Sequence, residues 1–333
     1  MTAYIIRRVL YGLLILVTVN ILLFMVFFQV HPPRAMAVRH LGEKYATDEA
    51  VENWLSEKGY DLPVFYNGDK AFPESLTRTL FWQKSIYLFA LDFGISDATE
   101  DPISDEILER IPPSLCIAVP SFVLGLFLAI VISMLVAFYR GSYLDGAALV
   151  ISVFLMSIPS MIYVVIFQYV FGNVLRVTPT SGFARTFPDV LRFIALPVSV
   201  IVISGIGGSV RYYRTVFMEE VNRDYIRTAR SKGLGEGKVL FKHALRNAIL
   251  PILTSVVAQL PFLIMGSMLV ERFFGIPGLG NYLIDAIGRN DFAVIRAIVF
   301  LGTALYIVAL ILVDISYCVA DPRIRVGGKE HGS

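Results

Sequence analysis

Residues that could carry out chemistry are few in this chain and are spread along it. The two cysteines, Cys116 and Cys318, fall in different apolar segments, so neither a disulfide nor a metal cluster is expected. The four histidines are equally scattered, at His31, His40, His243 and His331. No paired carboxylates or nucleophile–base arrangement emerges. The sequence therefore predicts neither a metal site nor an enzyme active site in this chain.

One glycine-rich run raises the question of phosphate binding. Residues 233–238 read Gly-Leu-Gly-Glu-Gly-Lys, and a lysine after glycines is part of a nucleotide-binding loop. That loop also needs a glycine where Lys232 stands, a serine or threonine where Val239 stands, and a preceding strand that this sequence does not predict. We therefore expect no cofactor in this chain, so energy for its work must come from another protein.

The elements around these residues are apolar runs of membrane length. Of the 333 residues 56% are hydrophobic and the mean hydropathy is +0.67, which is more apolar surface than one soluble core can bury. Uncharged runs occupy 9–30, 111–139, 146–175, 193–210, 248–270 and 297–313. Because backbone polar groups in lipid must be satisfied internally, the predicted fold is an all-α membrane bundle of six transmembrane helices. The first run is 22 residues long, which favours an uncleaved anchor over a signal peptide.

Lysine and arginine indicate the side of the membrane on which each connection lies. Residues 211–247 hold nine Lys/Arg against four acids, whereas residues 31–110 hold eight against fifteen. The expected orientation places both termini and 211–247 in the cytoplasm and 31–110 outside. The chain then divides into an anchor helix at 1–30, an extracytoplasmic segment at 31–110 between the first two spans, a core at 111–320 and a cytoplasmic tail at 321–333.

The extracytoplasmic segment contains two stretches that favour short helices, 49–59 and 104–110, separated by sequence rich in turns and aromatic residues. Its acids lack the spacing and the central glycine of a calcium loop, so no metal is expected there. Two interpretations stay open. The segment is a small scaffold or receptor platform, or it is a solvated connection that merely caps the helix bundle.

The basic run at 224–251 is the most informative feature of the chain. Apolar residues at helical spacing on both sides of Gly233 predict a helix, a turn and a second helix outside the bilayer, without an apolar core of their own. The run Arg227-Thr228-Ala229, followed by Gly233 and by Leu-Pro at 250–251, resembles the EAA loop of permease subunits in bacterial ATP-binding-cassette importers. Permeases of the peptide (Opp/Dpp) type are the most similar.

This run departs from the general EAA pattern in two respects, and the peptide-type subgroup is similar to it in both. Arg227 and Thr228 stand where the general pattern has Glu and Ala, and the interval from Gly233 to Leu-Pro is longer. The resemblance implies that the ATPase-coupling residues are Arg227, Thr228, Ala229, Gly233 and Leu234. A basic helical loop without that role is the alternative explanation of the composition.

Further segments are similar to the same family. Ser157-Ile158-Pro159 in the third run permits a kink, and Asp314-Ile-Ser-Tyr317 with Asp321-Pro322-Arg323 ends the sixth span. The glycines and proline of 271–280 cannot continue a membrane helix, so the chain must turn there. Candidate outer-gate residues at this turn are Glu271, Phe273, Pro277, Gly278 and Gly280. A simple turn back to the sixth span is the alternative.

Two of the spans carry side chains that suit a passage or close packing. The candidates for pathway lining are Ser255, Gln259, Met265 and Met268. Methionine adapts to varied cargo, although ordinary helix packing explains these residues equally well. Small residues from Ser204 to Ser209 are expected to let a neighbouring helix approach the fourth span closely.

The resemblance, which covers nearly the whole chain, implies one half of a heteromeric importer in the bacterial inner membrane. Its partners would be a second, related permease, two ATPase subunits that bind ATP and magnesium, an extracytoplasmic substrate-binding protein and the surrounding lipid. Substrates of the family include oligopeptides, dipeptides, glutathione, nickel chelates and oligosaccharides. No nucleic acid is expected, because the positive charge lies at the inner membrane face. An ion-coupled carrier or a membrane-embedded hydrolase would need mid-membrane charges or a nucleophile with its base, which the spans lack.

The orientation can be tested with single cysteines in a background that carries Cys116→Ser and Cys318→Ser. A membrane-impermeant maleimide added to intact spheroplasts should label Asp69→Cys and should label Lys238→Cys only after the membrane is permeabilised. The reverse pattern would overturn the orientation and, with it, a cytoplasmic role for the basic loop.

Overall fold

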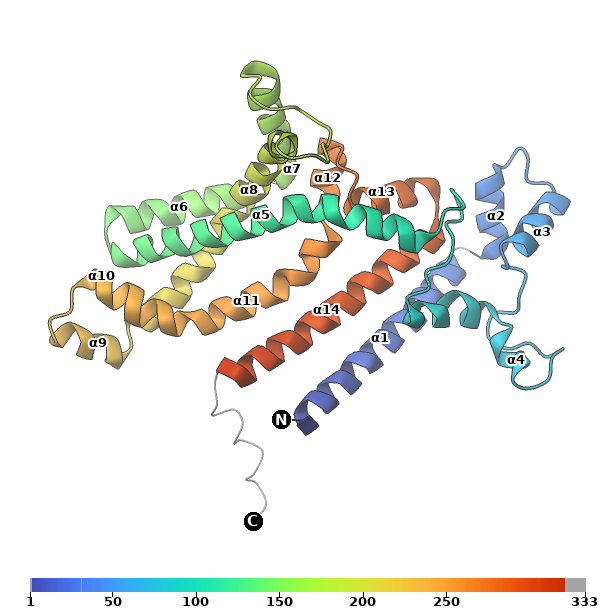
Figure 1. Ribbon diagram of the computed structural model, residues 1–333, viewed down its shortest axis with the longest axis horizontal. Coiled ribbons are helices and arrows are strands. Elements are labelled where there is room, and N and C mark those ends of the chain that lie inside the picture. The colour runs from blue at the N-terminus through green and yellow to red at the C-terminus, as the bar shows by residue number, and fades with distance from the viewer. Residues whose placement is uncertain (1, 31, 321–333) are drawn as a thin grey trace, which may run out of the picture. The chain divides into compact units, whose positions relative to one another are not determined.

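The computed structural model describes residues 2–30 and 32–320, and its regular structure is helical throughout (Figure 1). No β-strand occurs among these residues, although Ile95 and Pro102 form an isolated β-bridge. The predicted all-α fold is therefore confirmed. Asp321-Pro322-Arg323 and the tail expected at 321–333 lie outside the described residues.

The helices form two compact units. The first joins the chain up to Ile111 with Tyr282–Ile311, and the second is built on Pro112–Asn281. The first contains α1 (Thr2–Val30), α2 (Pro33–Leu41), α3 (Asp48–Glu57), α4 (Glu74–Thr77), η1 (Trp82–Ile86), η2 (Tyr87–Ala90) and most of α14 (Phe292–Ala320). The second contains α6 (Tyr143–Ser157), α7 (Ser160–Phe167), η3 (Gln168–Val174), α8 (Asp189–Val221), α9 (Asp224–Ser231), α10 (Glu236–Lys238), η4 (Val239–Ala244), α11 (Leu245–Met265) and α12 (Met268–Phe274). Three helices, α5 (Ile103–Phe138), α13 (Leu279–Arg289) and α14, contribute to both.

Four helical segments are long and apolar enough to cross a membrane: Ile6–Phe28, Ile103–Phe138, Asp189–Val221 and Phe292–Ile315. Two bent helix pairs also qualify, Tyr143–Ser157 with Ser160–Val174 and Glu236–Ile249 with Pro251–Met265. The described chain therefore has four candidate spans, or six if each bent pair counts as one span. The polytopic membrane fold is confirmed, and the count of six stays a prediction.

Both bends occur near prolines, which remove a backbone donor and crowd the preceding turn. At Pro159 the axes of the two helices differ by 88°, so the expected kink is confirmed as a full break. The expected continuous helix at 248–270 is wrong. It ends at Met265, because Gly266 adopts a left-handed φ of +71° and a new helix starts at Met268.

Two further boundaries differ from those expected. The separate short helix at 104–110 is wrong, because α5 runs without interruption from Ile103 through Pro112 and Pro113 into the apolar run. The fourth span, expected to end at 210, belongs to a helix that continues to Val221. The other short helix, expected at 49–59, is confirmed as α3, whose first turn is capped by the Thr47 hydroxyl.

Residues 32–110 contribute to a packed core. Helices α2 and α3 lie side by side (Figure 1), and Trp54 of α3 stacks on Tyr60 with ring centroids 5.5 Å apart. The buried members of this core are Phe24, Met36, Ala37, Val51, Trp54, Tyr60, Leu80 and Phe292. Because Phe24 belongs to α1 and Phe292 to α14, the segment packs on the first and last long helices of its unit.

Two buried carboxylates join the loop before α5 to the start of α14. Asp291 precedes this helix, accepts a hydrogen bond from Val294 N at 3.2 Å, and also binds Ser96 Oγ and Asp97 N. Asp97 accepts from Ala293 N at 3.3 Å and from the Tyr60 hydroxyl at 2.9 Å. Carboxylates are favoured at a helix N-terminus, where backbone donors lack partners. These bonds fix the 94–99 loop to α14.

In the second unit, α6 packs closely against α8. A Cβ at Gly207 would lie 2.5 Å from the Ser152 carbonyl oxygen, so glycine is what allows the approach that the small residues of α8 predicted. Arg214 of α8 forms two 2.8 Å hydrogen bonds with the carboxylate of Asp145 in α6. Two N–H groups of the guanidinium thus meet the two carboxylate oxygens in a bidentate ion pair that joins the helices.

The α6–α8 contact can be tested with two neighbouring glycines of α8. Gly207→Ala should lower the thermal stability of the purified protein, because its methyl group meets a backbone carbonyl, and overpacking costs about 1–3 kcal/mol. Gly208→Ala should leave stability equal or higher, since the nearest atom, Met156 Cε, would be 3.9 Å away. The measurement is the temperature at which the monodisperse peak is lost on size-exclusion chromatography. Equal effects of the two substitutions would contradict the packing argument.

Candidate functional site

The basic loop at 211–247, here called the coupling loop, folds as expected but has a core that the sequence argument excluded. Helix α9 ends at Ser231, Gly233 turns the chain with φ +76°, and α10 leads through η4 into α11. The expectation of no apolar core is wrong. The loop buries Val221, Ile226, Ala229, Val239, Leu240 and Ala244, with Leu234 packed against them. The two helical stretches close on each other through these side chains, so the loop is a structured element.

Of the five predicted coupling residues, three are exposed. Arg227, Thr228 and Gly233 lie on the surface, Leu234 is half-buried, and Ala229 belongs to the loop core. Arg230 bridges the turn by donating from Nε and Nη2 to the two carboxylate oxygens of Glu236, at 2.6 and 3.1 Å. No atom lies within 4 Å of the Cβ position at Gly233. The turn therefore presents an open surface, and the Arg230–Glu236 ion pair stabilises its conformation.

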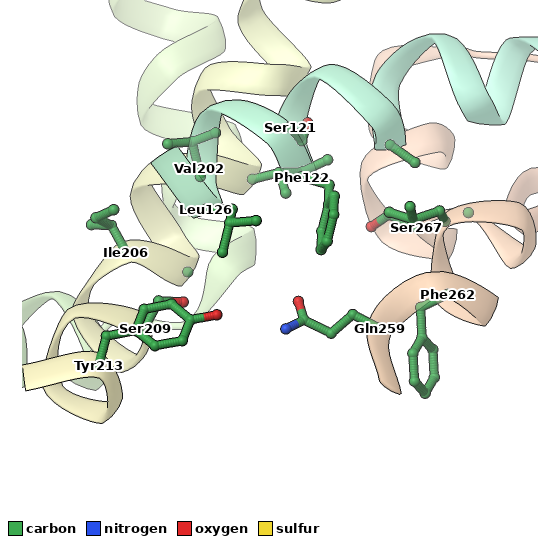
Figure 2. Close-up of a pocket in the computed structure, with 16 residues that line it drawn as sticks. Ser121, Phe122, Leu126, Val202, Ile206, Ser209, Tyr213, Gln259, Phe262 and Ser267 are labelled. Carbon is green, nitrogen blue, oxygen red and sulfur yellow. The ribbon is translucent and has the colours of Figure 1, made fainter. Parts of the chain in front are cut away.

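A cavity of about 400 Å³ lies between α5, α8 and α11. Figure 2 shows the amide of Gln259 on α11 and the hydroxyl of Tyr213 on α8 pointing toward each other across it, with Phe122 of α5 above the Gln259 side chain. Ser121 and Ser209 add further hydroxyl groups. Every residue that lines the cavity is uncharged. Such a lining can contact solutes of different kinds through apolar surface and single hydrogen bonds.

The predicted pathway residues are distributed unevenly around this cavity. Gln259 lines it, and its amide nitrogen donates to the Ser255 carbonyl at 3.0 Å. Ser255 is not among the lining residues, but its hydroxyl lies 2.8 Å from that of Tyr213, which lines the cavity. Met265 and Met268 do not line the cavity, and Met268 is an exposed residue at the start of α12. The structure thus adds Tyr213, which sequence reasoning missed because a tyrosine in an apolar run has no distinctive pattern.

The predicted gate segment is organised around one buried carboxylate. Glu271 is 1% exposed, and its Oε1 accepts from Ser114 Oγ at 2.8 Å and from Ser267 N at 3.3 Å. Its Oε2 accepts from Asn281 N at 3.0 Å. Ser114 also accepts from Leu279 N at 2.9 Å, so the serine links α5, α12 and α13. Burial raises the pKa of Glu271, and these hydrogen bonds oppose that shift.

Three glycines make room for this carboxylate. A Cβ at Gly266 would lie 2.0 Å from Glu271 Oε1, and one at Gly278 would lie 2.4 Å from both Oε2 and Ser114 Oγ. A Cβ at Gly280 would lie 2.7 Å from Met268 N. The expected turn at 271–280 is confirmed, with Gly275 in the left-handed region. Glu271, Ser114, Ser267, Asn281 and the three glycines form what we call the Glu271 cluster.

The remaining gate candidates lie beside this cluster. Pro277 is half-buried, and the ring of Phe273 is partly exposed while its carbonyl accepts from Gln168 Nε2 at 3.0 Å. The structure therefore brings together Glu271, Gly278 and Gly280 among the predicted residues. It adds Ser114, Ser267, Asn281 and Gly266, for which no motif was visible, although a lone glutamate between apolar helices implies buried partners.

A helical membrane fold that combines an uncharged cavity with a structured basic loop is typical of the membrane subunit of a transporter. Residues 129–326 match the family described as the binding-protein-dependent transport system inner membrane component, and residues 1–118 match the N-terminal family of these components. The chain belongs to this family and is a permease subunit of an ATP-binding-cassette importer. It is a multi-pass inner-membrane component that works with ATPase and substrate-binding-protein subunits, and ATP hydrolysis lies in the ATPases.

Several curated relatives are similar over most of their length. A putative peptide transport system permease protein of Brucella abortus (strain 2308) is 32% identical over 329 residues, which cover 98% of this chain and 99% of the relative. The glutathione transport system permease protein GsiC of Escherichia coli (strain K12) is 30% identical over 325 residues, with the same coverage. The dipeptide transport system permease protein DppB of Bacillus subtilis (strain 168) is 31% identical over 288 residues, covering 86% of this chain and 88% of the relative.

The Glu271 cluster can be tested by removing its central hydroxyl. Ser114→Ala leaves Glu271 without one donor and Leu279 N–H without an acceptor, and each orphaned buried group costs about 1–3 kcal/mol. Thermal stability in detergent should fall clearly. The matched control is Ser133→Ala in the same helix, where the buried hydroxyl donates only to carbonyls of its own helix and its loss should have little effect. If the two variants unfold at the same temperature, Ser114 does not hold the cluster together.

Proposed function

We propose that this subunit lines half of the passage of a peptide importer and couples it to the ATPases through the turn at Gly233. The observation that carries the proposal is the exposed, internally braced coupling loop, whose helices continue into two walls of the cavity. Relatives named for peptide, dipeptide and glutathione transport support a peptide or peptide-like solute as the substrate. A second permease, similar to this one, supplies the other half.

A push on the loop has a continuous route to the cavity. Helix α8 carries Tyr213 at the cavity and ends at Val221 in the loop core, and α11 carries Gln259 and is joined to the loop by η4. Between the cavity and the loop, α5, α8 and α11 share a buried cluster that contains Phe217, Ala248 and Ile252. Packed helices move as rigid bodies, so movement of the ATPases would tilt α8 and α11 together.

The remaining partners follow from this division of roles. Two ATPase subunits bind ATP and magnesium, and the exposed Arg227, Thr228 and Gly233 contact one of them. Both termini and the coupling loop lie in the cytoplasm, and residues 31–110 lie outside, where the binding protein delivers substrate. The Glu271 cluster with Phe273 and Pro277 closes the outer side. Because the cavity lining is uncharged, the binding protein selects the substrate and the passage stays permissive.

The experiment that tests this proposal introduces a carboxylate at the turn. Gly233→Asp should abolish transport and substrate-stimulated ATP hydrolysis while leaving the permease in the membrane, because charge and bulk then occupy the docking surface. The matched control is Gly42→Asp, at a glycine with φ +80° that also has no atom within 4 Å of its Cβ position. The control adds the same charge and backbone strain away from the loop. Normal uptake by the Gly233→Asp variant, or equal loss in both variants, would exclude the coupling role.

A further inference from the structure

A second cavity, of about 170 Å³, lies wholly in the first unit and has no role in the proposed passage. It is walled by η1, by the 92–97 loop and by the first turns of α14. Three cationic side chains line it: Lys58, Lys84 and Arg296. Glu57, Asp92 and Asp97 are its acidic residues. The cations and the acids differ in burial and in how many of their polar atoms have hydrogen-bond partners.

Arg296 is the least satisfied cation of the cavity. Its side chain is 5% exposed, its Nε donates to the Phe292 carbonyl at 3.3 Å, and its Nη1 is buried without a hydrogen-bond partner in the described structure. The guanidinium carbon lies 5.4 Å from the centre of the Phe28 ring. This cation–π contact stabilises the positive charge but provides no acceptor for an N–H group in the plane of the guanidinium. A buried guanidinium with a free N–H is unusual, because such groups are normally paired.

Lys84 resembles Arg296 in having no paired carboxylate among the described residues. Its ammonium donates to the Lys58 carbonyl at 2.8 Å and lies 4.4 Å from the centre of the Tyr60 ring. Within the described part of the chain, no carboxylate lies within ion-pairing distance of Lys84 or Arg296. Burial lowers the pKa of Lys84, and the positive charge of Arg296 lowers it further. The carboxylate of Asp97 opposes this shift, and the positive charge of Lys58 adds to it. Lys58 differs, because it pairs with the exposed Glu100 at 2.8 Å.

The nearby acids do not neutralise these two cations directly. Asp97 directs Oδ2 to the Tyr60 hydroxyl and to Ala293 N. Asp291, buried beside the cavity, binds Ser96 and backbone N–H groups of the 96–98 turn and α14. Glu57 and Asp92 are exposed at the rim. In the described structure, Asp97 and Asp291 thus accept from hydroxyl and backbone donors and form no hydrogen bond with Lys84 or Arg296.

We infer that this cavity binds a carboxylate between Lys84 and Arg296. A carboxylate matches the planar guanidinium, supplies acceptors to Nη1 and to the Lys84 ammonium, and is small enough for the cavity. A bound water would satisfy one N–H group but would leave both charges unpaired. The carboxylate comes from a free small acid or from the carboxyl terminus of a peptide. This site goes beyond the proposed function and does not depend on it.

The test uses the reactivity of Lys84 in the full-length chain, purified from membranes with its accompanying subunits. An amine-reactive ester is applied at neutral pH, and mass spectrometry compares labelling of Lys84 with that of the exposed Lys70. Acetate should protect Lys84 in a saturable manner, while chloride at equal ionic strength should not. If the bound anion raises the Lys84 pKa by about one unit, the reactive free amine decreases about tenfold. N-acetyl-Gly-Gly and N-acetyl-Gly-Gly-amide, which have no free amine to consume the ester, distinguish the sources, because only the former has a terminal carboxylate.

Two variants separate binding from general electrostatics. Arg296→Gln should abolish the protection by acetate, whereas Arg289→Gln, which removes an exposed cation outside the cavity, should retain it. Protection of the wild type without saturation, equal protection of Lys84 and Lys70, or unchanged protection in Arg296→Gln would overturn the inference. Absence of any acetate effect in the wild type would overturn it independently, even if Arg296→Gln failed to assemble. Protection by N-acetyl-Gly-Gly at lower concentration than acetate would assign the site to peptide carboxyl termini.

Discussion

Backbone N–H and C=O groups away from water must find partners within the protein, and this constraint shapes the whole chain. Regular helices meet it along the apolar runs. Where helical geometry stops between α11 and α13, Glu271 accepts from Ser267 N and Asn281 N, and Ser114 accepts from Leu279 N. One carboxylate and one hydroxyl therefore replace the helical bonds that the glycine turns interrupt, at the cost of burying an ionisable group.

The same reasoning explains why glycines surround Glu271. The carboxylate can receive several backbone donors only if those backbones come close to it, and a side chain at Gly266 or Gly278 would occupy the position of its oxygens. Glycine usually weakens a helix by exposing backbone and adding flexibility. Here the close approach replaces flexibility with a fixed geometry. A segment that looks in sequence like a loose linker is thus one of the more constrained parts of the second unit.

Sequence patterns predicted the elements well and the contacts between elements poorly. Hydropathy identified every long helix, and Pro159 located the sharpest break, because both signals act within a few residues. The end of α11 at Met265 was missed, since Gly266 lies inside an apolar run and its φ depends on distant packing. Of the Glu271 cluster, the turn residues were identified but Ser114, 157 residues earlier in the chain, was not. The core of the coupling loop was also missed, because short amphipathic helices can pack on each other as readily as on a partner.

In the second unit, charged side chains form ion pairs that hold elements together, and none of them lines the cavity. Its bidentate ion pairs, Asp145–Arg214 and Arg230–Glu236, brace helices and the turn of the coupling loop, while the cavity lining carries no charge. A charged lining would bind oppositely charged cargo strongly and hold it, whereas transport requires release on the other side. For the passage that we propose, rigid walls with weak contacts would resolve this conflict, because the helices could transmit movement without tight binding of the cargo. Under the proposed coupling, the free energy of transport would be supplied at the loop, where the structure is braced, and would not have to come from the cargo.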